Sequence, residues 1–496
     1  ACSSSAFADV NYSLSITQPE HHLGNVSVEF PQTAQAHLDI KLPAWRTGRY
    51  EILNLANGVR FFEAKDDDGK ALEWEKIDHS TWRVHLNEPT QVNVDYQVYA
   101  NELGKRARHI DDSHAFIDAS GFFMFSESFR QDPVKVELNV PKEWRSVSGM
   151  ENAGSKHSFK AADYDILVDS PIETGINELH KFTVDGREYE LVIWGEGNYD
   201  VDQMLTDLKK LVKTGNVIWD SYPYERYVFM VHATSGAGGA TEHLNSTIIQ
   251  RPRDRFGSRK DYLAFISTAA HEFIHTWNVK AYRPKGIAPY DYTNINYAKT
   301  LWIAEGSTSY FEDHLMVRAG IETTDEFFGT LTKTVNRHLP TPGREVQSAT
   351  ETSFDKWINQ GGDHARNYST NIYLEGALIS MALDIDLLEK SDGKISYRDV
   401  HRALYNKHRL PDGFTPDDVK AILKELTGRD YSAWWQSNVD EPAAIDFDLL
   451  LAKVGLGLIR PEGAKSIPSI DSFAKNSGEL LTLTHVRRGG AAWQAG

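Results

Sequence analysis

The spacing of apolar residues changes once along this chain, and that change limits the folds open to it. From about Val10 to Val168 apolar and polar residues alternate, which is the pattern of strands with one buried face. From about Tyr199 onward the apolar residues recur every three to four positions, which is the pattern of helices with one buried side. The sequence therefore predicts a multidomain α+β protein, with an N-terminal β-sandwich-like domain followed by a mainly helical part with a small sheet.

Turn and cap residues locate individual elements in both parts. Asp185-Gly186 lies between two apolar runs and predicts a β-hairpin, because this pair favours the positive φ angles of a tight turn. The expected strands centre on apolar runs at 26–30, 38–42, 82–86, 92–98, 134–140 and 227–232. The expected helices lie at 201–219, from 258 to before 284, and at 297–318, 370–389 and 415–428. After Ile445 the pattern indicates a return to short strands.

Length and charge narrow the class of protein. At about 150 residues per domain, 496 residues predict roughly three domains. The chain has 53 Lys and Arg residues against 70 Asp and Glu residues, a net charge of −17 at pH 7. This balance argues against a nucleic-acid-binding protein, and the short basic clusters at 105–108 and 251–255 are interpreted as solvated surface. No stretch approaches the ~18 consecutive apolar residues of a transmembrane segment.

The single cysteine, Cys2, excludes an intramolecular disulfide and any site built on several cysteine ligands. Ala1-Cys2-Ser3-Ser4-Ser5 resembles the end of a bacterial lipoprotein signal, in which a Ser-rich tether follows a lipidated Cys. We therefore expect an exported protein, in the bacterial periplasm or at the outer membrane, with a lipid anchor at Cys2. The alternatives are a leftover cloning end and a cytoplasmic location.

The sequence His271-Glu272-Phe273-Ile274-His275 lies in the middle of one expected helix. Two His residues four positions apart project from the same face about one turn from each other, close enough to bind one zinc ion. Glu272 follows the first His and can reach a metal-bound water without binding the metal itself. The motif predicts a hydrolytic zinc site. The alternative is an amphipathic helix with two partly exposed His residues.

A catalytic zinc site needs a third protein ligand and an open fourth position for water. The helix around the motif is largely apolar, so His271 and His275 are expected on a mostly buried element, where imidazoles without partners would be costly. Glu305, on the next expected helix after 29 intervening residues, is the candidate third ligand. His314 on the same helix is the competing candidate, but it lies two and a half turns further on and is expected to face the opposite side.

These segments resemble a known family. His271 to Lys280 and Trp302 to Tyr310 are similar to the two motifs of the glycyl aminopeptidase family of gluzincin metallopeptidases. The resemblance covers nearly the whole chain. Pro43 to Tyr50 is similar to the family's Trp-x-Pro-Gly-x-Tyr stretch, with Thr47 where Pro is usual, and Asp169 to Glu173 resembles the entry to the catalytic domain.

The resemblance implies a division into domains. It implies an N-terminal β domain at 1–175, a thermolysin-like zinc catalytic domain at 176–325 and a helical extension of that domain at 326–442. Residues 478–496 resemble the first part of a PDZ domain, so 443–496 is expected to be a partial, truncated PDZ-like β segment.

A Gly-rich loop follows the expected strand at 227–232. Residues 236–246 resemble the exopeptidase segment of zinc aminopeptidases, in which a carboxylate holds the free α-ammonium of the substrate. The resemblance implies that Glu242 is this amine anchor and that Gly238 and Gly239 let the backbone approach the substrate closely. His243, which stands where Asn is usual, is an alternative contact to the substrate carbonyl. Without the family, the segment is only a Gly-rich turn.

A tyrosine completes the candidate site. Tyr373-Leu374-Glu375-Gly376 resembles the Tyr-x-Lys-Gly pattern in which Tyr donates a hydrogen bond to the oxyanion, with Glu375 in place of Lys. Tyr373 is therefore the implied oxyanion donor and Tyr368 the second choice. The alternative is that Tyr373 is a core residue of an amphipathic helix.

The motif predicts a zinc hydrolase with one zinc ion, and the resemblance implies a metalloaminopeptidase that removes N-terminal residues, of small size such as Gly or Ala, from peptides with a free N-terminus. The catalytic residues would be Glu272 and Tyr373, the metal ligands His271, His275 and Glu305, and the substrate-binding residues Glu242, Gly238, Gly239 and His243. One alternative is an endopeptidase with the same zinc ligands. Another is a non-catalytic, envelope-tethered peptide-binding protein with structural zinc, which would need a fourth ligand such as His314.

Overall fold

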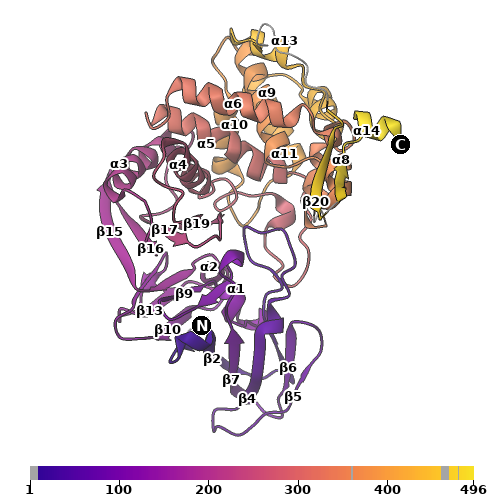
Figure 1. Cartoon of the computed structure of the whole chain (residues 1–496). Helices are drawn as coiled ribbons and strands as arrows, with labels where there is room; N and C mark the ends of the chain where they lie inside the picture. Colours follow the sequence, from indigo (N-terminus) through magenta and orange to yellow (C-terminus); the bar gives the residue numbers. More distant parts are fainter. Residues whose placement is uncertain (1–8, 359–360, 460–468, 479) are drawn as a thin grey trace. The chain divides into compact units, whose positions relative to one another are not determined.

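The computed structural model describes residues 9–358, 361–459, 469–478 and 480–496 (Figure 1). Cys2, the predicted lipid attachment site, lies outside the described residues. The chain divides into two compact units. The first unit is Ala1–Lys213, Pro223–Thr276 and Asp291–Ile295, and the second unit is Thr214–Tyr222, Trp277–Tyr290 and Asn296–Gly496. The predicted four-part division of the chain stays a prediction.

The described residues of the first unit form four sheets. Its largest sheet has the strand order β12-β13-β10-β1-β2-β7-β4, and the others run β11-β14-β9-β8, β3-β6-β5 and β15-β16-β17-β19-β18. The strands are β1 (Val10–Ser15), β2 (Leu23–Thr33), β3 (His37–Lys41), β4 (Val59–Lys65), β5 (Trp74–Lys76), β6 (Thr81–His85), β7 (Thr90–Tyr99), β8 (Arg108–Ile110), β9 (His114–Ile117), β10 (Val134–Asn139), β11 (Arg145–Ser148), β12 (Glu151–Asn152), β13 (Ser158–Ala161), β14 (Ile172–Gly175), β15 (Asn177–Val184), β16 (Arg187–Trp194), β17 (Arg226–Thr234), β18 (Gly239–Glu242) and β19 (Ser246–Pro252). Its helices are α1 (Ala119–Phe122), α2 (Tyr164–Val168), α3 (Val201–Val212) and α4 (Arg259–Ile274).

The alternating pattern of the N-terminal residues produces the predicted half-buried strands. On β2, Val26, Val28 and Phe30 are buried. They lie opposite Tyr96, Val94 and Val92 of the antiparallel β7, which are buried as well. Because side chains at every second position share one face of a sheet, this register buries one whole face of both strands. The predicted β-rich N-terminal architecture is confirmed.

The five-stranded sheet carries the helix that contains His271 and His275. In it, β16, β17 and β19 run parallel, while β15 and β18 pair antiparallel at the two edges. The predicted hairpin joins β15 to β16, with Asp185 and Gly186 at φ angles of 49° and 82°. Helices α3 and α4 lie side by side next to this sheet, and α4 contacts β18 and β19 (Figure 1).

Two helices end earlier than the sequence pattern predicts. Helix α4 begins at the predicted cap, Ser258, but ends at Ile274, and Val279 beyond it has a φ of 106°, which no helix accommodates. Helix α3 ends at Val212 and is followed by a 3₁₀ segment, Lys213–Val217. A Cβ at Gly215 would lie 2.6 Å from the ring of Trp277. Tertiary packing therefore overrides the helical pattern at these ends.

The second unit is mainly helical. Its helices are α5 (Ser307–Arg318), α6 (Thr324–His338), α7 (Ala349–Phe354), α8 (Gly362–Tyr368), α9 (Leu374–Lys390), α10 (Tyr397–Lys407), α11 (Pro416–Thr427), α12 (Ser432–Trp435), α13 (Phe447–Ala452) and α14 (Ala491–Ala495). A π-helical turn, Trp302–Gly306, precedes α5. Gly320 and Gly428 follow the ends of α5 and α11, as predicted. Their φ angles are 66° and 69°, which a glycine adopts without strain. In the described residues no helix is long and apolar enough to cross a bilayer.

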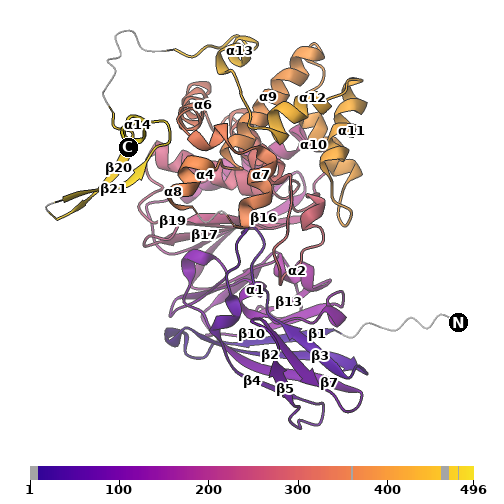
Figure 2. The same cartoon turned by 90° about the vertical axis from the view of Figure 1, so that its right-hand side faces the viewer.

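The return to strands directly after Ile445 is wrong. Asp446 accepts a hydrogen bond from the backbone N–H of Leu449 and begins helix α13, which buries Phe447 and Leu451. Its apolar residues four positions apart pack against α6 and α9 side chains, so helical burial decides the structure. In the part of this segment that the structure describes, strands form later, as the antiparallel pair β20 (Ser472–Ser477) and β21 (Leu480–Val486) (Figure 2). The PDZ-like interpretation of this segment stays a prediction.

A buried histidine makes the stability of the helical unit sensitive to acid. His401 on α10 is fully buried, its Nδ1 lies 2.7 Å from the hydroxyl of Tyr282, and burial lowers its pKa to about 3. The unfolded chain, with a His pKa near 6.5, therefore binds a proton that the folded protein does not. The His401 contribution to the free energy of unfolding is full above pH 6.5 and falls as pH drops toward 3, by on the order of 5 kcal/mol in total.

We expect the His401→Asn variant to be less stable than the parent at pH 7.5, because a smaller side chain leaves space in the core. Between pH 6.5 and 4 its urea unfolding midpoint should fall less steeply than that of the parent, since the variant has no ring to protonate. Equal slopes in the two proteins would contradict this assignment.

Candidate metal centre and substrate site

The last turn of α4 brings the two predicted His ligands together. His271 is half-buried and His275 is fully buried, and their Nε2 atoms lie 3.1 Å apart. Two nitrogens bound to one tetrahedral zinc at 2.0–2.1 Å would be about 3.3 Å apart. Most of the apolar residues predicted to bury this helix are buried, namely Ile266, Ala269, Ala270, Phe273, Ile274 and Trp277, whereas Leu263 is only partly buried. The donor type and the spacing of this pair fit zinc.

Two carboxylates lie next to this pair within the first unit. One carboxylate oxygen each of Glu242 and Glu272 and a ring nitrogen of His275 lie within 4.8 Å of one another. Both carboxylates are nearly buried, with 5% and 6% of their surface exposed. Glu272 comes from α4 and Glu242 from the end of β18, an edge strand of the sheet. The predicted general base and the predicted amine anchor are therefore neighbours.

The loop that contains Gly48 packs closely against Glu242. Gly48 has a φ of 74°, and a Cβ at this position would lie 2.5 Å from Oε2 of Glu242 and 2.8 Å from Cγ2 of Thr241. A glycine at position 48 is thus required both by its backbone conformation and by the closeness of the carboxylate. The sequence marked this loop only as a family motif and gave it no place at the site.

One arginine holds the strand that carries Glu242, and a second interacts with Glu242 electrostatically. Arg106 donates to the hydroxyl of Thr241 and to the carbonyl of Gly238, at 3.1 and 2.9 Å. Arg46 is completely buried and donates to the carbonyls of Lys105 and Thr47. Burial, together with the charge of Arg106, lowers the pKa of Arg46 to about 10, and the carboxylates of Asp118 and Glu242 oppose that lowering. Arg46 therefore places a buried positive charge in the field of Glu242.

The remaining predicted substrate residues have contacts within the protein. A Cβ at Gly239, which has a φ of 113°, would lie 2.6 Å from the guanidinium of Arg106. The contacts seen at Gly238 and Gly239 are thus with Arg106, and their binding of substrate stays a prediction. His243 is fully buried, and its Nδ1 lies 3.3 Å from Oδ1 of Asp169. Substrate contact by His243 also stays a prediction.

In the second unit, Glu305 lies on the π-helical turn before α5 and is 3% exposed. The turn packs closely on α9: a Cβ at Gly306 would lie 2.4 Å from the Cα of Gly376. Asn278 donates to the carbonyls of Ile303 and Ala304, at 2.9 and 3.1 Å, in the turn that contains Glu305. Single π-helical turns are frequent at functional sites because they displace a side chain from the regular helix.

Tyr373 and the two competing residues also lie in the second unit. Tyr373 caps α9 and lines a cavity of about 350 Å³ with His314 and Tyr310. His314 contacts the rings of Tyr310 and Phe327, and among the described residues it belongs to no group of His and acidic side chains that could hold a metal. Tyr368, the second choice, stacks on His364 and lies under the guanidinium of Arg488.

Glu375, which stands in place of the family's Lys, has a structural partner. Its carboxylate is buried 3.0 Å from Nδ1 of His338 and accepts a hydrogen bond from the hydroxyl of Thr370. The departure from the family pattern at this position is therefore accommodated inside the helical unit.

Two family models match the chain. The Peptidase M61 N-terminal domain matches residues 11–176, and the M61 glycyl aminopeptidase model matches residues 264–379, together more than half of the chain. The chain belongs to the M61 glycyl aminopeptidase family. It is a metalloaminopeptidase, a hydrolase that acts on peptide bonds, and the resemblance seen in the sequence is confirmed.

Solved structures agree with this family. An aminopeptidase N family protein from Idiomarina loihiensis is 26% identical with a TM-score of 0.91, and the match covers 98% of this chain and 87% of that chain. More distant matches have the same fold. A variant M1 zinc metallopeptidase from Deinococcus radiodurans bound to a Tyr-Ser-Ala substrate is 13% identical, with a TM-score of 0.56 and coverage of 89% and 95%. Yeast LTA4 hydrolase in complex with bestatin is 14% identical, with a TM-score of 0.53 and coverage of 89% and 68%. No curated protein sequence matched.

Proposed function

We propose that this protein is a zinc aminopeptidase that removes the first residue, one with a small side chain, from peptides with a free N-terminus. The observation that carries the proposal is the closeness of Glu242, Glu272 and His275, whose polar atoms lie within 4.8 Å of one another. An anchor for a positive charge, a general base and a metal ligand thus share one small volume.

This spacing selects the first peptide bond. In a peptide, the α-amino nitrogen and the first carbonyl carbon are separated by only two bonds, about 2.5 Å, and each further carbonyl lies about 3.8 Å further along the chain. An ammonium held by Glu242 therefore brings the first carbonyl to Glu272, and the next carbonyl lies beyond it. The carboxylate of Glu242 therefore restricts a zinc peptidase to the first peptide bond, which is the activity of an exopeptidase.

Glu305 is the third zinc ligand in this proposal. In the sequence, Glu305 is the carboxylate of the motif that follows His271 and His275, and the family resemblance implies that it is their partner. The short chain segment between His275 and Asn278 supports Glu305 as the third ligand. Asn278, which binds the turn containing Glu305, follows His275 by three residues, and three residues of chain span at most about 11 Å. Two His residues and one carboxylate leave a fourth position for water.

The roles of the side chains follow. When bound, zinc polarises the scissile carbonyl and lowers the pKa of its water toward ~7. Glu272 accepts the proton of the attacking water and delivers it to the leaving amine. Tyr373 donates a hydrogen bond to the carbonyl oxygen as it becomes negative. Glu242 pairs with the α-ammonium, and this charge-assisted bond is strong because the carboxylate of Glu242 is nearly buried.

Two further proposals have narrower support. The preference for Gly or Ala is supported by the family and by the close packing of Gly48 against Glu242, which leaves little room on that side of the carboxylate. Export with lipid attachment at Cys2 is supported by the sequence Ala1-Cys2-Ser3 alone. Fractionation of cells that express the natural protein, followed by mass analysis of its N-terminus, tests the second proposal.

Removal of the metal tests the zinc requirement. We expect a strong chelator to remove nearly all hydrolysis of aminoacyl p-nitroanilides, and a small excess of Zn²⁺ to restore it. Mg²⁺ or Ca²⁺ should not restore it, because these ions prefer oxygen ligands and two of the three proposed ligands are imidazoles. Undiminished activity in a protein shown by elemental analysis to hold no zinc would refute the proposal.

A further inference from the structure

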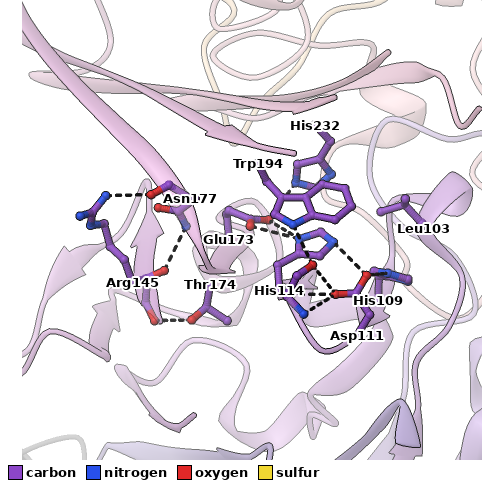
Figure 3. A network of polar contacts seen from close by, with 12 residues as sticks. Leu103, His109, Asp111, His114, Arg145, Glu173, Thr174, Asn177, Trp194 and His232 are labelled. Carbon is purple, nitrogen blue, oxygen red and sulfur yellow. Dashed lines mark hydrogen bonds and ion pairs between the residues drawn. The ribbon is translucent and has the colours of Figure 1, made fainter. Parts of the chain in front are cut away.

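A second group of metal-ligating side chains lies in the first unit, away from α4 in the sequence. His109 on β8, Asp111 in the turn and His114 on β9 belong to one β-hairpin (Figure 3). Their ligand atoms lie within 4.8 Å of one another. We call these three residues the hairpin His–Asp cluster. Neither the predicted mechanism nor the family motifs in the sequence use them.

The hydrogen bonds around His114 fix which ring nitrogen carries the proton. Nε2 of Gln250 donates to the carbonyl of Leu103 and lies 3.4 Å from Nδ1 of His232, so this nitrogen of His232 accepts. His232 therefore donates from Nε2 to Glu173, at 2.8 Å. The other oxygen of Glu173 lies 3.1 Å from Nδ1 of His114, which must then be the protonated nitrogen of that ring.

This assignment leaves a lone pair on Nε2 of His114. The ring is fully buried. Its Nε2 has no hydrogen-bond partner among the described residues. The nearest acidic oxygen is Oδ2 of Asp111, 4.0 Å away, which is too far for a hydrogen bond. Two electron pairs thus face each other across a gap, and a buried acceptor in this position is costly unless a cation or a donor lies between.

The other groups of the cluster are arranged toward the same gap. Oδ1 of Asp111 accepts three hydrogen bonds, from the backbone N–H of Ser113 and of His114 and from the Ser113 hydroxyl. This directs Oδ2 toward the two rings, and Nε2 of His109 lies 3.0 Å from it. Trp194 stacks on His114 with ring centres 3.5 Å apart and donates to the Ser113 hydroxyl, which fixes the ring and the turn (Figure 3).

We propose that the hairpin His–Asp cluster binds a second divalent transition-metal ion, with Zn²⁺ the best fit, through His109, Asp111 and His114. Two imidazoles and one carboxylate are a zinc ligand set with an open position for water. The contact of His114 with Glu173 is the carboxylate–histidine–metal arrangement that orients a ligating ring and raises its basicity. Asp111, whose side chain is 25% exposed, gives the ion a route from solvent.

The position of the cluster indicates what the ion does. His114 lies on the four-stranded sheet, and Glu173 links it to His232 on β17 of the five-stranded sheet, which also carries Glu242. An ion on the hairpin would therefore stabilise the junction between the N-terminal sheets and the sheet that bears the amine anchor. This role is structural and does not depend on the proposed peptidase reaction.

Zinc counting on the full chain tests the proposal. After saturation with Zn²⁺ and gel filtration, we expect about two zinc ions per chain in the parent, and about one in each of His109→Asn, Asp111→Asn and the His271→Ala/His275→Ala double variant. Asp111→Asn keeps the oxygen that holds the turn, and His109→Asn leaves the three hydrogen bonds to Oδ1 of Asp111 in place, so these variants should fold. His85→Asn is the matched control, because His85 and Glu75 form an exposed His–carboxylate pair 3.2 Å apart without a third ligand in any described metal group.

Two further readouts separate an ion from a bridging water. In the His271→Ala/His275→Ala variant, added Co²⁺ should give a visible d–d absorption band, and added Zn²⁺ should raise the melting temperature by several degrees. Adding Asp111→Asn should abolish both. If His109→Asn and Asp111→Asn bind as much zinc as the parent and the Co²⁺ band does not change, the cluster holds only water and the proposal is wrong. Loss of zinc from the His271→Ala/His275→Ala variant tests the catalytic site separately.

Discussion

The Glu272→Gln variant is expected to lose on the order of 10²–10⁴-fold in kcat toward aminoacyl p-nitroanilides while it still binds zinc. Gln has the size of Glu but cannot accept a proton at neutral pH. Glu272 is 6% exposed and follows His271 on α4, so the substitution leaves the ligands in place. KM should change little, because the lost interaction belongs to the transition state.

Glu190→Gln is a suitable control for this variant. Glu190 is a similarly buried carboxylate on β16 that pairs with Arg226 and Lys181 and belongs to none of the described metal groups. It should keep near-parental kcat even if its stability falls. A Glu272→Gln enzyme with full activity and one bound zinc would show that Glu272 is not the base.

The second large effect is expected at Glu242. Removing one partner of a nearly buried, hydrogen-bonded charge pair costs about 3–5 kcal/mol, which corresponds to roughly 10²–10⁴-fold in kcat/KM. We expect this loss in Glu242→Ala for substrates with a free amine. Glu242→Gln should fall between the parent and Glu242→Ala, because an amide still accepts a hydrogen bond but carries no charge.

The loss of activity in Glu242→Ala should be limited to substrates with a free amine. Because the missing interaction is with the ammonium, the variant should cleave N-acetylated substrates no worse than the parent does. Circular dichroism and zinc content should match those of the parent. If Glu242→Ala loses activity equally on free and acetylated substrates, Glu242 supports the site without recognising the amine.

Local signals explain how much of the fold could be predicted. The alternation at 26–30 and 92–98, the Asp185-Gly186 turn and the glycines at 320 and 428 act over a few residues, and each is found in the structure as expected. The ends of α3 and α4 could not be predicted, because Trp277 packs on Gly215 and residue 279 leaves the helical region. The helix at 447–452 was missed because its buried partners lie on α6 and α9.

In the candidate site, too, local features could be predicted from the sequence and long-range contacts could not. His271, Glu272 and His275 lie within five residues on one helix, so their spacing alone predicts the zinc pair. Gly48 and Arg46 reach Glu242 from almost 200 residues away in the sequence, and only the fold brings them there. The hairpin His–Asp cluster has a readable spacing, His-x-Asp-x-x-His, but its support from Glu173 and His232 comes from two other strands.

The central claim is that a zinc site and an amine anchor together make this chain an aminopeptidase. The measurement that tests it most directly is the hydrolysis of a panel of aminoacyl p-nitroanilides and their N-acetyl counterparts by the parent protein, with and without chelator. We predict zinc-dependent cleavage of the free-amine substrates, fastest for Gly and Ala, and little or no cleavage of the acetylated ones. Equal cleavage of free and acetylated substrates would contradict the account and would favour an endopeptidase.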